Sequence, residues 1–260
     1  MQRSDWNGAV VVVTGAAGGL GRALAEGLAE RGARVHAVDV DAAGLGALSA
    51  AVDGTTAHQV DVADAEAVND LVDKVVHQDG RLDHIFNNAG IFAAGPFEEL
   101  DDATWRRIVD INLWGVINGT RAAYSQMLKQ GSGHIVNTAS SAGVLPVAKG
   151  VAYAATKHGV VGLSTSLRAE AARKGVKVSV VVPGLVDTGI FATAKEINGY
   201  DYDRKIEQLP FGKIPASRAA SEIIAGVERN RQFITFPRSN RVIVGLNRLL
   251  PDVMSPVINR

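Results

Sequence analysis

The stretch Val10-Val11-Val12-Val13-Thr14-Gly15-Ala16-Ala17-Gly18-Gly19-Leu20-Gly21 decides the fold of this chain of 260 residues. It opens with a β-branched run, which is typical of a strand buried on both faces of a parallel sheet. Its glycines permit unusual backbone conformations and let the main chain approach a phosphate closely. Leu24 and Leu28 follow at helical spacing. The sequence therefore predicts a strand, a turn and a helix whose N-terminus can bind a pyrophosphate. An ordinary glycine-rich loop would lack this context.

A second run, Val35-His36-Ala37-Val38, ends at Asp39. This acid lies roughly 20 residues after the glycine-rich turn, where a carboxylate can bind the ribose hydroxyls of an adenosine group. The alternative is that Asp39 only starts the next helix, but Asp41 can supply that N-cap instead. We favour ribose binding because the turn precedes it.

Tyr153 and Lys157 form a third motif, in Tyr153-Ala154-Ala155-Thr156-Lys157. Residues four apart on a helix share one face, so the phenol is expected beside the ammonium group. A nearby positive charge lowers the pKa of a tyrosine from its usual value of about 10. Such a tyrosine can act as a general acid and base near neutral pH. Taken alone, this spacing is more often found in a solvated surface pair. We interpret the pair as functional because the glycine-rich turn precedes it in the chain.

Strand-like and helix-like segments alternate along the chain. The strand-like runs are 9–14, 34–39, 55–60, 83–86, 134–138, 176–182 and 233–236. Helix-like stretches include 64–77, 103–129 with Asp102 as its expected N-cap, and 150–174. This alternation predicts right-handed crossovers and one parallel sheet with helices on both faces. Ligands bind beyond the carboxyl ends of such strands. The candidate residues at those ends are Gly15, Asp39, Asp61, Asn88, Ser140 and Pro183.

Together these motifs resemble the short-chain dehydrogenase/reductase family, and the resemblance covers most of the chain. The T-G-x-x-x-G-x-G motif spans Thr14 to Gly21, and Asp39 is the acid after the second strand. The remaining motifs, in chain order, are Asp61-Val62, Asn87-Asn88-Ala89-Gly90, Asn112, Ser140, Tyr153 with Lys157, Pro183-Gly184 and Thr188. The loop at about 189–215 and the tail 229–260 depart from the pattern, which leaves the substrate undetermined.

The resemblance implies an α/β fold, a single-domain Rossmann-type doubly wound parallel sheet over residues 1–260. It implies that NAD is the cofactor and that the catalytic residues are Asn112, Ser140, Tyr153 and Lys157. Asn112 would hold a water that links Lys157 to solvent, and Ser140 would bond the substrate oxygen, although a strand-end cap is its alternative. The implied cofactor-binding residues are Gly15, Gly19, Leu20, Gly21, Asp39, Asp61, Val62, Asn88, Ala89, Gly90, Tyr153, Lys157, Pro183, Gly184 and Thr188.

Composition excludes several other classes of protein. The chain has 27 basic and 27 acidic side chains, which argues against a nucleic-acid binder. It has no Cys, its six His residues lack metal-ligand spacing, and neither G-x-S-x-G nor G-K-[ST] is present. Met1 to Gly8 lacks the regions of a signal peptide, and no apolar run reaches the ~18 residues of a membrane span. A cytoplasmic enzyme without a metal is therefore expected.

The expected reaction interconverts an alcohol and a ketone or aldehyde. The residues of the candidate substrate pocket are mostly apolar. A lipophilic small molecule is the expected substrate. The candidate pocket residues are Ile91, Phe92, Val144, Leu145, Pro146, Leu185, Ile190 and Phe191. One alternative is an NADP-dependent carbonyl reductase, but the acidic Asp39 and the neutral Gly18 argue against NADP. The other is a cofactor-binding scaffold without catalytic activity, which would be expected to lose a catalytic residue.

The long helices around Asn112 and Tyr153, with Trp114, predict a homodimer or homotetramer. The tail carries six Arg, no Lys and one acid, Asp252. Within it a helical apolar stripe is expected, which Pro251 would shorten or kink. The stripe residues are Val242, Leu246, Leu249, Leu250 and Val253. We expect the stripe to pack on the body or a neighbouring subunit, and contact with an anionic membrane is the less favoured alternative.

Overall fold

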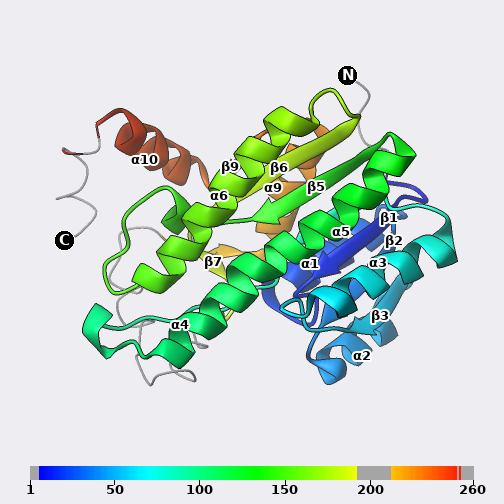
Figure 1. Ribbon diagram of the computed structural model, residues 1–260, viewed down its shortest axis with the longest axis horizontal. Coiled ribbons are helices and arrows are strands. Elements are labelled where there is room, and N and C mark those ends of the chain that lie inside the picture. Colours follow the sequence, from blue (N-terminus) through cyan, green and yellow to red (C-terminus); the bar gives the residue numbers. More distant parts are fainter. Residues whose placement is uncertain (1–5, 192–211, 251, 253–260) are drawn as a thin grey trace.

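A parallel sheet forms the centre of the molecule (Figure 1). The computed structural model describes residues 6–191, 212–250 and 252. In this part of the chain, seven strands lie in the order β3-β2-β1-β4-β5-β6-β9, and every neighbouring pair is parallel. They are β1 Val10–Thr14, β2 Arg34–Asp39, β3 Thr55–Gln59, β4 His84–Asn87, β5 Gly133–Thr138, β6 Val176–Pro183 and β9 Phe233–Phe236. The predicted doubly wound α/β fold is confirmed.

Helices cover both faces of the sheet. They are α1 Gly19–Ala29, α2 Ala42–Ala51, α3 Ala65–Asp79, α4 Asp102–Val109, α5 Gly115–Gln130, α6 Val151–Ala171, α9 Ala216–Glu228 and α10 Arg238–Leu249. Shorter elements are the 3-10 turns η1 Phe97–Glu99 and η3 Ser141–Gly143, the π-helical turn η2 Asp110–Trp114, and the strand pair β7 Val186–Asp187 and β8 Ile214–Pro215. The described helices include none that is both long and apolar enough to cross a bilayer.

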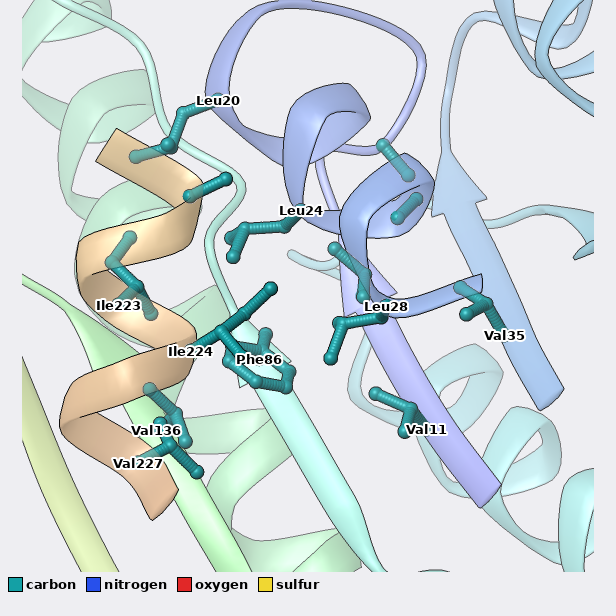
Figure 2. Packing of buried hydrophobic residues seen from close by; sticks show 14 of the residues in the cluster. Val11, Leu20, Leu24, Leu28, Val35, Phe86, Val136, Ile223, Ile224 and Val227 are labelled. Carbon is teal, nitrogen blue, oxygen red and sulfur yellow. The ribbon is translucent and has the colours of Figure 1, made fainter. Parts of the chain in front are cut away.

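Strand β1 shows why the sequence forms this layered core. Its four valines are fully buried, and they alternate between two clusters on opposite faces of the sheet. Val11 and Val13 face α1 and α9, whereas Val10 and Val12 face α3 and α5. Figure 2 shows the first cluster, in which Leu24 and Leu28 of α1 meet Ile224 of α9 above the strands.

The region 103–129 differs from its prediction as one continuous helix. Asp101, not Asp102, caps α4, since its carboxylate accepts a hydrogen bond from Thr104 N at 2.8 Å. The π-helical turn η2 then separates α4 from α5. This turn contains Asn112, a feature that hydrophobic periodicity could not reveal because the helical axis continues through it. Helix α9 and the strand pair β7 and β8 were not predicted from the sequence.

Helix α10 confirms the predicted tail helix but not its packing on the body. Val242, Leu246, Leu249 and Leu250 are all exposed. The other side of the helix faces the body, where Asn240 bonds Val182 O of β6 and Asn247 bonds Val144 O after η3. Val253 of the predicted stripe, Pro251, and most of the predicted substrate loop at 189–215 lie outside the described residues.

The turn between β1 and α1 depends on a close backbone contact. A Cβ atom at Gly21 would lie 1.9 Å from the carbonyl oxygen of Gly15 and 2.8 Å from Nδ2 of Asn88. Gly15 itself has a φ of +69°, which L side chains rarely adopt. Gly18, by contrast, has an extended φ of −153°, and no described atom lies within 4 Å of a Cβ placed there.

We predict that Gly21→Ala lowers the free energy of unfolding by about 3 kcal/mol, because the methyl group must displace a backbone carbonyl. The matched control is Gly18→Ala, which adds the same methyl group to open space and should cost less than about 1 kcal/mol as an N-cap change. Urea unfolding followed by circular dichroism measures both values. Equal stability losses in the two variants would contradict this account of the turn.

Candidate active site

The first turn of α1 forms one wall of the candidate site. Its N-cap residue is Gly18, which has no side chain to accept hydrogen bonds from the N–H groups of the first turn. Thr188 lies against this turn, since a Cβ at Gly19 would be 3.0 Å from both Cβ and O of Thr188. The structure therefore brings the predicted residues Gly15, Gly19, Leu20, Gly21 and Thr188 together. Backbone N–H groups at a helix N-terminus are suited to bind a pyrophosphate.

Asp39 joins the end of β2 to the same turn. One carboxylate oxygen accepts a hydrogen bond from Ala17 N at 3.0 Å, and the other accepts one from Asp41 N at 3.1 Å. Asp41 is the N-cap of α2 and accepts from the N–H groups of Ala43 and Gly44. The helix-capping role thus belongs to Asp41, as expected, and Asp39 remains partly exposed beside the turn.

Thr14 contributes to the site, although the sequence identified it only as the first residue of the glycine-rich motif. Its hydroxyl oxygen accepts hydrogen bonds from Asn88 N at 2.9 Å and Ala89 N at 3.0 Å. The amide of Asn88 donates in return to Thr14 O at 3.2 Å. These bonds hold the segment after β4 against the glycine-rich turn. The threonine that begins T-G-x-x-x-G-x-G was the signal that could have identified this role.

Asp61 and Val62 lie beyond the end of β3, at the adjoining edge of the site. The carboxylate of exposed Asp61 accepts a hydrogen bond from Ala63 N at 2.9 Å. Val62 is buried against Gly115, where a Cβ would lie 2.6 Å from its Cγ2. The buried amide of Asn118 donates to Val62 O at 3.0 Å, an anchor that the sequence did not reveal.

Tyr153 and Lys157 lie on one face of α6, as their spacing predicted. The Lys157 ammonium nitrogen is 5.5 Å from the centre of the Tyr153 ring, and it donates a hydrogen bond to Thr138 O at 3.0 Å. Ser140 follows β5 and caps η3, because its hydroxyl oxygen accepts from Ala142 N at 3.1 Å. A side-chain hydrogen bond also joins Ser140 to Tyr153. Ser140 therefore both caps a turn and contacts the tyrosine.

The electrostatics of this pair differ from the prediction that Lys157 lowers the tyrosine pKa. Burial raises the pKa of Tyr153 to about 12, and the hydrogen bond with Ser140 opposes this rise. Burial also lowers the pKa of Lys157 to about 8. Both side chains are under one-tenth exposed, so loss of hydration disfavours the charged form of each group. Lys157 Nζ lies near the ring of Tyr153 and donates to a backbone carbonyl rather than to the phenol oxygen. Burial therefore decides the direction in which the pKa of Tyr153 shifts.

Asn112 is fully buried in η2 and ties two segments together. Its side-chain oxygen accepts from Ile91 N and its amide donates to Ile91 O, each at 2.8 Å. Gly90 fits between this side chain and the lysine, since a Cβ there would lie 3.2 Å from Asn112 Oδ1 and 3.4 Å from Lys157 Nζ. Asn112 thus fixes the backbone after β4 beside Tyr153 and Lys157.

Pro183 and Gly184 complete the row of strand ends. Pro183 ends β6, and Gly184 N donates to Phe236 O of β9 at 2.8 Å. Buried Asn240 of α10 supports this corner through its hydrogen bond to Val182 O. The predicted residues therefore gather along one edge of the sheet, the edge at which parallel strands end and ligands bind in such folds.

Apolar side chains surround Tyr153. The rings of Tyr153 and Phe191 each meet Phe92 edge to face, with centroids 4.9 Å and 5.1 Å from it. The predicted pocket residues that join this cluster are Ile91, Phe92, Leu185, Ile190 and Phe191. Val144 belongs to a neighbouring cluster with Val116 and Val160, and Pro146 is exposed.

The residues present fit a dinucleotide. The uncapped helix N-terminus and its Cβ-free turn suit a pyrophosphate, Asp39 suits ribose hydroxyls, and Lys157 lies near Tyr153 at the far end of the row. A metal centre has no comparable support, since no group of three or more His, Cys, Asp or Glu among the described residues could hold an ion.

Comparison with known proteins agrees with this arrangement. A family model described as short chain dehydrogenase matches residues 9–198. D-threitol dehydrogenase of Mycolicibacterium smegmatis is 42% identical over 186 residues, which cover 70% of this chain and 72% of that protein. The NAD(+) 15-hydroxyprostaglandin dehydrogenase of Mus musculus is 36% identical over 239 residues, with 85% and 86% covered.

A solved structure of similar shape is a short chain dehydrogenase/reductase of Burkholderia phymatum in complex with NAD. It has a TM-score of 0.88 and 30% sequence identity, and the match covers 96% of each chain. The fold, the row of motifs and these matches agree that the chain belongs to the short-chain dehydrogenase/reductase family of oxidoreductases.

Proposed function

We propose that this protein is an NAD-dependent oxidoreductase that interconverts an alcohol and a ketone or aldehyde, with Tyr153 as general acid and base. The observation that carries the proposal is that Ser140 and Lys157 both adjoin the buried Tyr153 at the carboxyl edge of the sheet, beside an uncapped helix N-terminus. A cofactor-binding scaffold without activity would have no need to keep both groups beside the tyrosine.

Each catalytic side chain has a distinct task in this proposal. A bound nicotinamide supplies the acceptor or donor of the hydride. With its raised pKa, Tyr153 is protonated at neutral pH and can donate its proton to a carbonyl oxygen. Ser140 hydrogen-bonds the same substrate oxygen and stabilises developing charge. Lys157, oriented by Thr138 O, holds the nicotinamide ribose, and Asn112 keeps the backbone at Ile91 in position.

The apolar surroundings of Tyr153 favour a lipophilic alcohol or ketone. Phe92, Leu185 and Phe191 belong to the same apolar cluster as Tyr153. Such a surface strengthens binding by removing apolar substrate area from water. The prostaglandin dehydrogenase relative acts on a lipid by its name, whereas the threitol dehydrogenase acts on a sugar alcohol, so relatives alone support either class.

A screen of alcohols with NAD, and of ketones with NADH, tests the proposed activity through the absorbance of the reduced nicotinamide. Sterols, terpenoid alcohols and long-chain secondary alcohols should be turned over faster than short polyols, because their apolar area matches the cluster around Tyr153. Absence of turnover with every compound, in protein that binds NADH, would support the scaffold alternative.

We predict that Tyr153→Phe lowers kcat by about 10²–10⁴-fold and leaves NADH affinity nearly unchanged, because only the proton-transfer group is removed. Lys157→Ala should impair both turnover and NADH binding, since Lys157 also holds the cofactor. The control is Tyr124→Phe, the same change outside the site. Stopped-flow rates and fluorescence titration with NADH provide the two readouts, and near wild-type turnover in Tyr153→Phe would show that another group transfers the proton.

NAD should be preferred over NADP, because the carboxylate of Asp39 repels a phosphate on the adenosine ribose. Asp39→Ala should weaken NAD binding and reduce the ratio of kcat/KM for NAD to that for NADP at least about tenfold. Asp41→Ala is the matched control, since it removes a nearby carboxylate that caps α2 and should preserve the ratio. Equal efficiency of the wild type with both cofactors would be incompatible with this role of Asp39.

We also propose that the protein is a homodimer or homotetramer paired through the surface of α5 and α6. Trp114, Leu128 and Val151 are exposed there, which suits an interface core.

Light scattering should give a mass of two or four times 27.3 kDa. Trp114→Glu should shift the mass toward one chain, because the new carboxylate would be buried without a partner. Val40→Glu, which alters an exposed valine elsewhere, should keep the wild-type mass. A wild-type mass near 27.3 kDa at micromolar concentration would exclude this assembly.

A further inference from the structure

Helix α10 carries an apolar stripe that faces away from the sheet. Val242, Leu246, Leu249 and Leu250 are 60%, 43%, 77% and 52% exposed. They recur at i, i+4, i+7 and i+8, so they share one face of the helix. The opposite face is fastened by Asn240, whose amide donates to Val182 O, and by Asn247, whose amide donates to Val144 O at 3.1 Å.

Positive charge lies along one edge of this stripe. The 12 residues of α10 include Arg238, Arg241 and Arg248 and no acid. With about 3.6 residues per turn, all three arginines fall on the same side of the apolar face. Arg241 lies 3.9 Å from Glu222, whereas Arg238 and Arg248 form no ion pair with any other described residue. Arg241 also donates a hydrogen bond to Thr235 O at 2.6 Å, so it is held on the body of the protein. The helix therefore combines exposed aliphatic side chains with two arginines, Arg238 and Arg248, that have no nearby countercharge among the described residues.

We propose that α10 docks on an anionic lipid surface, with its stripe among the acyl chains and with Arg238 and Arg248 at the headgroups. A basic amphipathic helix of this kind lies in the membrane interface, and its binding combines buried apolar area with attraction to anionic lipids. Each cation near such a surface strengthens binding about fivefold. The inference is independent of the proposed reaction, since it depends only on the surface of α10.

Charge complementarity favours lipid over a second copy of the chain. A two-fold symmetric contact through this stripe would place the basic edges of both copies in one interface, because such interfaces use the same patch twice. Like charges opposed across an interface disfavour association. An anionic bilayer instead supplies the missing countercharge along the whole edge and also accepts the leucines.

The helix also adjoins the candidate active site. Val144, which accepts the bond from Asn247, directly follows η3, the turn that Ser140 caps. Docking through α10 would therefore hold this side of the site near the lipid surface.

Co-sedimentation of the full-length protein with vesicles tests the proposal. The wild type should sediment with vesicles of equal parts phosphatidylcholine and phosphatidylglycerol, and not with phosphatidylcholine alone. Binding should weaken as salt rises, because screening shortens the range of the attraction. Leu246→Gln/Leu249→Gln should weaken binding at least about tenfold, since less apolar area enters the lipid. Arg238→Gln/Arg248→Gln should weaken it about thirtyfold.

The matched control is Arg31→Gln/Arg173→Gln, which removes the same charge from exposed sites outside α10 and should bind like the wild type. Circular dichroism checks that each variant is folded. The proposal fails if the wild type does not sediment with anionic vesicles, or if both α10 variants bind as tightly as the control. A light-scattering mass that falls in Leu246→Gln/Leu249→Gln, without vesicle binding by the wild type, would assign the stripe to a second copy.

Discussion

The close contact between Gly21 and the carbonyl of Gly15 is the constraint on which the rest of the site depends. It leaves no room for a Cβ, so the chain can pass from β1 to α1 through a tight turn of residues 15–18. The same close approach admits the amide of Asn88, whose bond to Thr14 fixes the end of β4. Ala17, within the turn, donates to Asp39 at the end of β2. One turn thus sets the relative positions of three strand ends, and those strands carry much of the site.

Burial governs the chemistry at the other end of the row. Tyr153 and Lys157 are nearly inaccessible, and burial moves the pKa of the phenol up to about 12 and that of the ammonium group down to about 8. Both shifts favour uncharged forms, so the protein holds a protonated phenol beside a lysine that loses its proton more readily than usual. Local packing thus helps to set which proton is available, and Ser140 and Thr138 orient the two groups through hydrogen bonds.

Sequence patterns predicted those parts of the fold that follow from short-range periodicity. The valines of β1 identified a doubly buried strand, and the turn glycines predicted where α1 begins. Asp41 was correctly considered as the cap of α2. The π-helical turn at Asn112 was missed because the helical axis continues through it, and the bond of Asn112 to Ile91 was missed because the two residues are distant in sequence. The prediction of a lowered pKa for Tyr153 was wrong, because i and i+4 spacing predicts that two side chains are close but not that they are buried. Likewise, the periodicity of α10 revealed an apolar stripe but not the side of the helix that faces the body.

The most direct test of the account is a crystal structure of the protein with NAD bound. The account predicts that the pyrophosphate contacts backbone N–H groups at Gly19 to Gly21, that the adenosine ribose contacts Asp39, and that the nicotinamide ribose contacts Lys157. Tyr153 and Ser140 should both face the nicotinamide across the space left for a substrate. A dinucleotide bound elsewhere, or one whose nicotinamide lies away from Tyr153, would contradict the claim that this edge of the sheet is one preorganised oxidoreductase site.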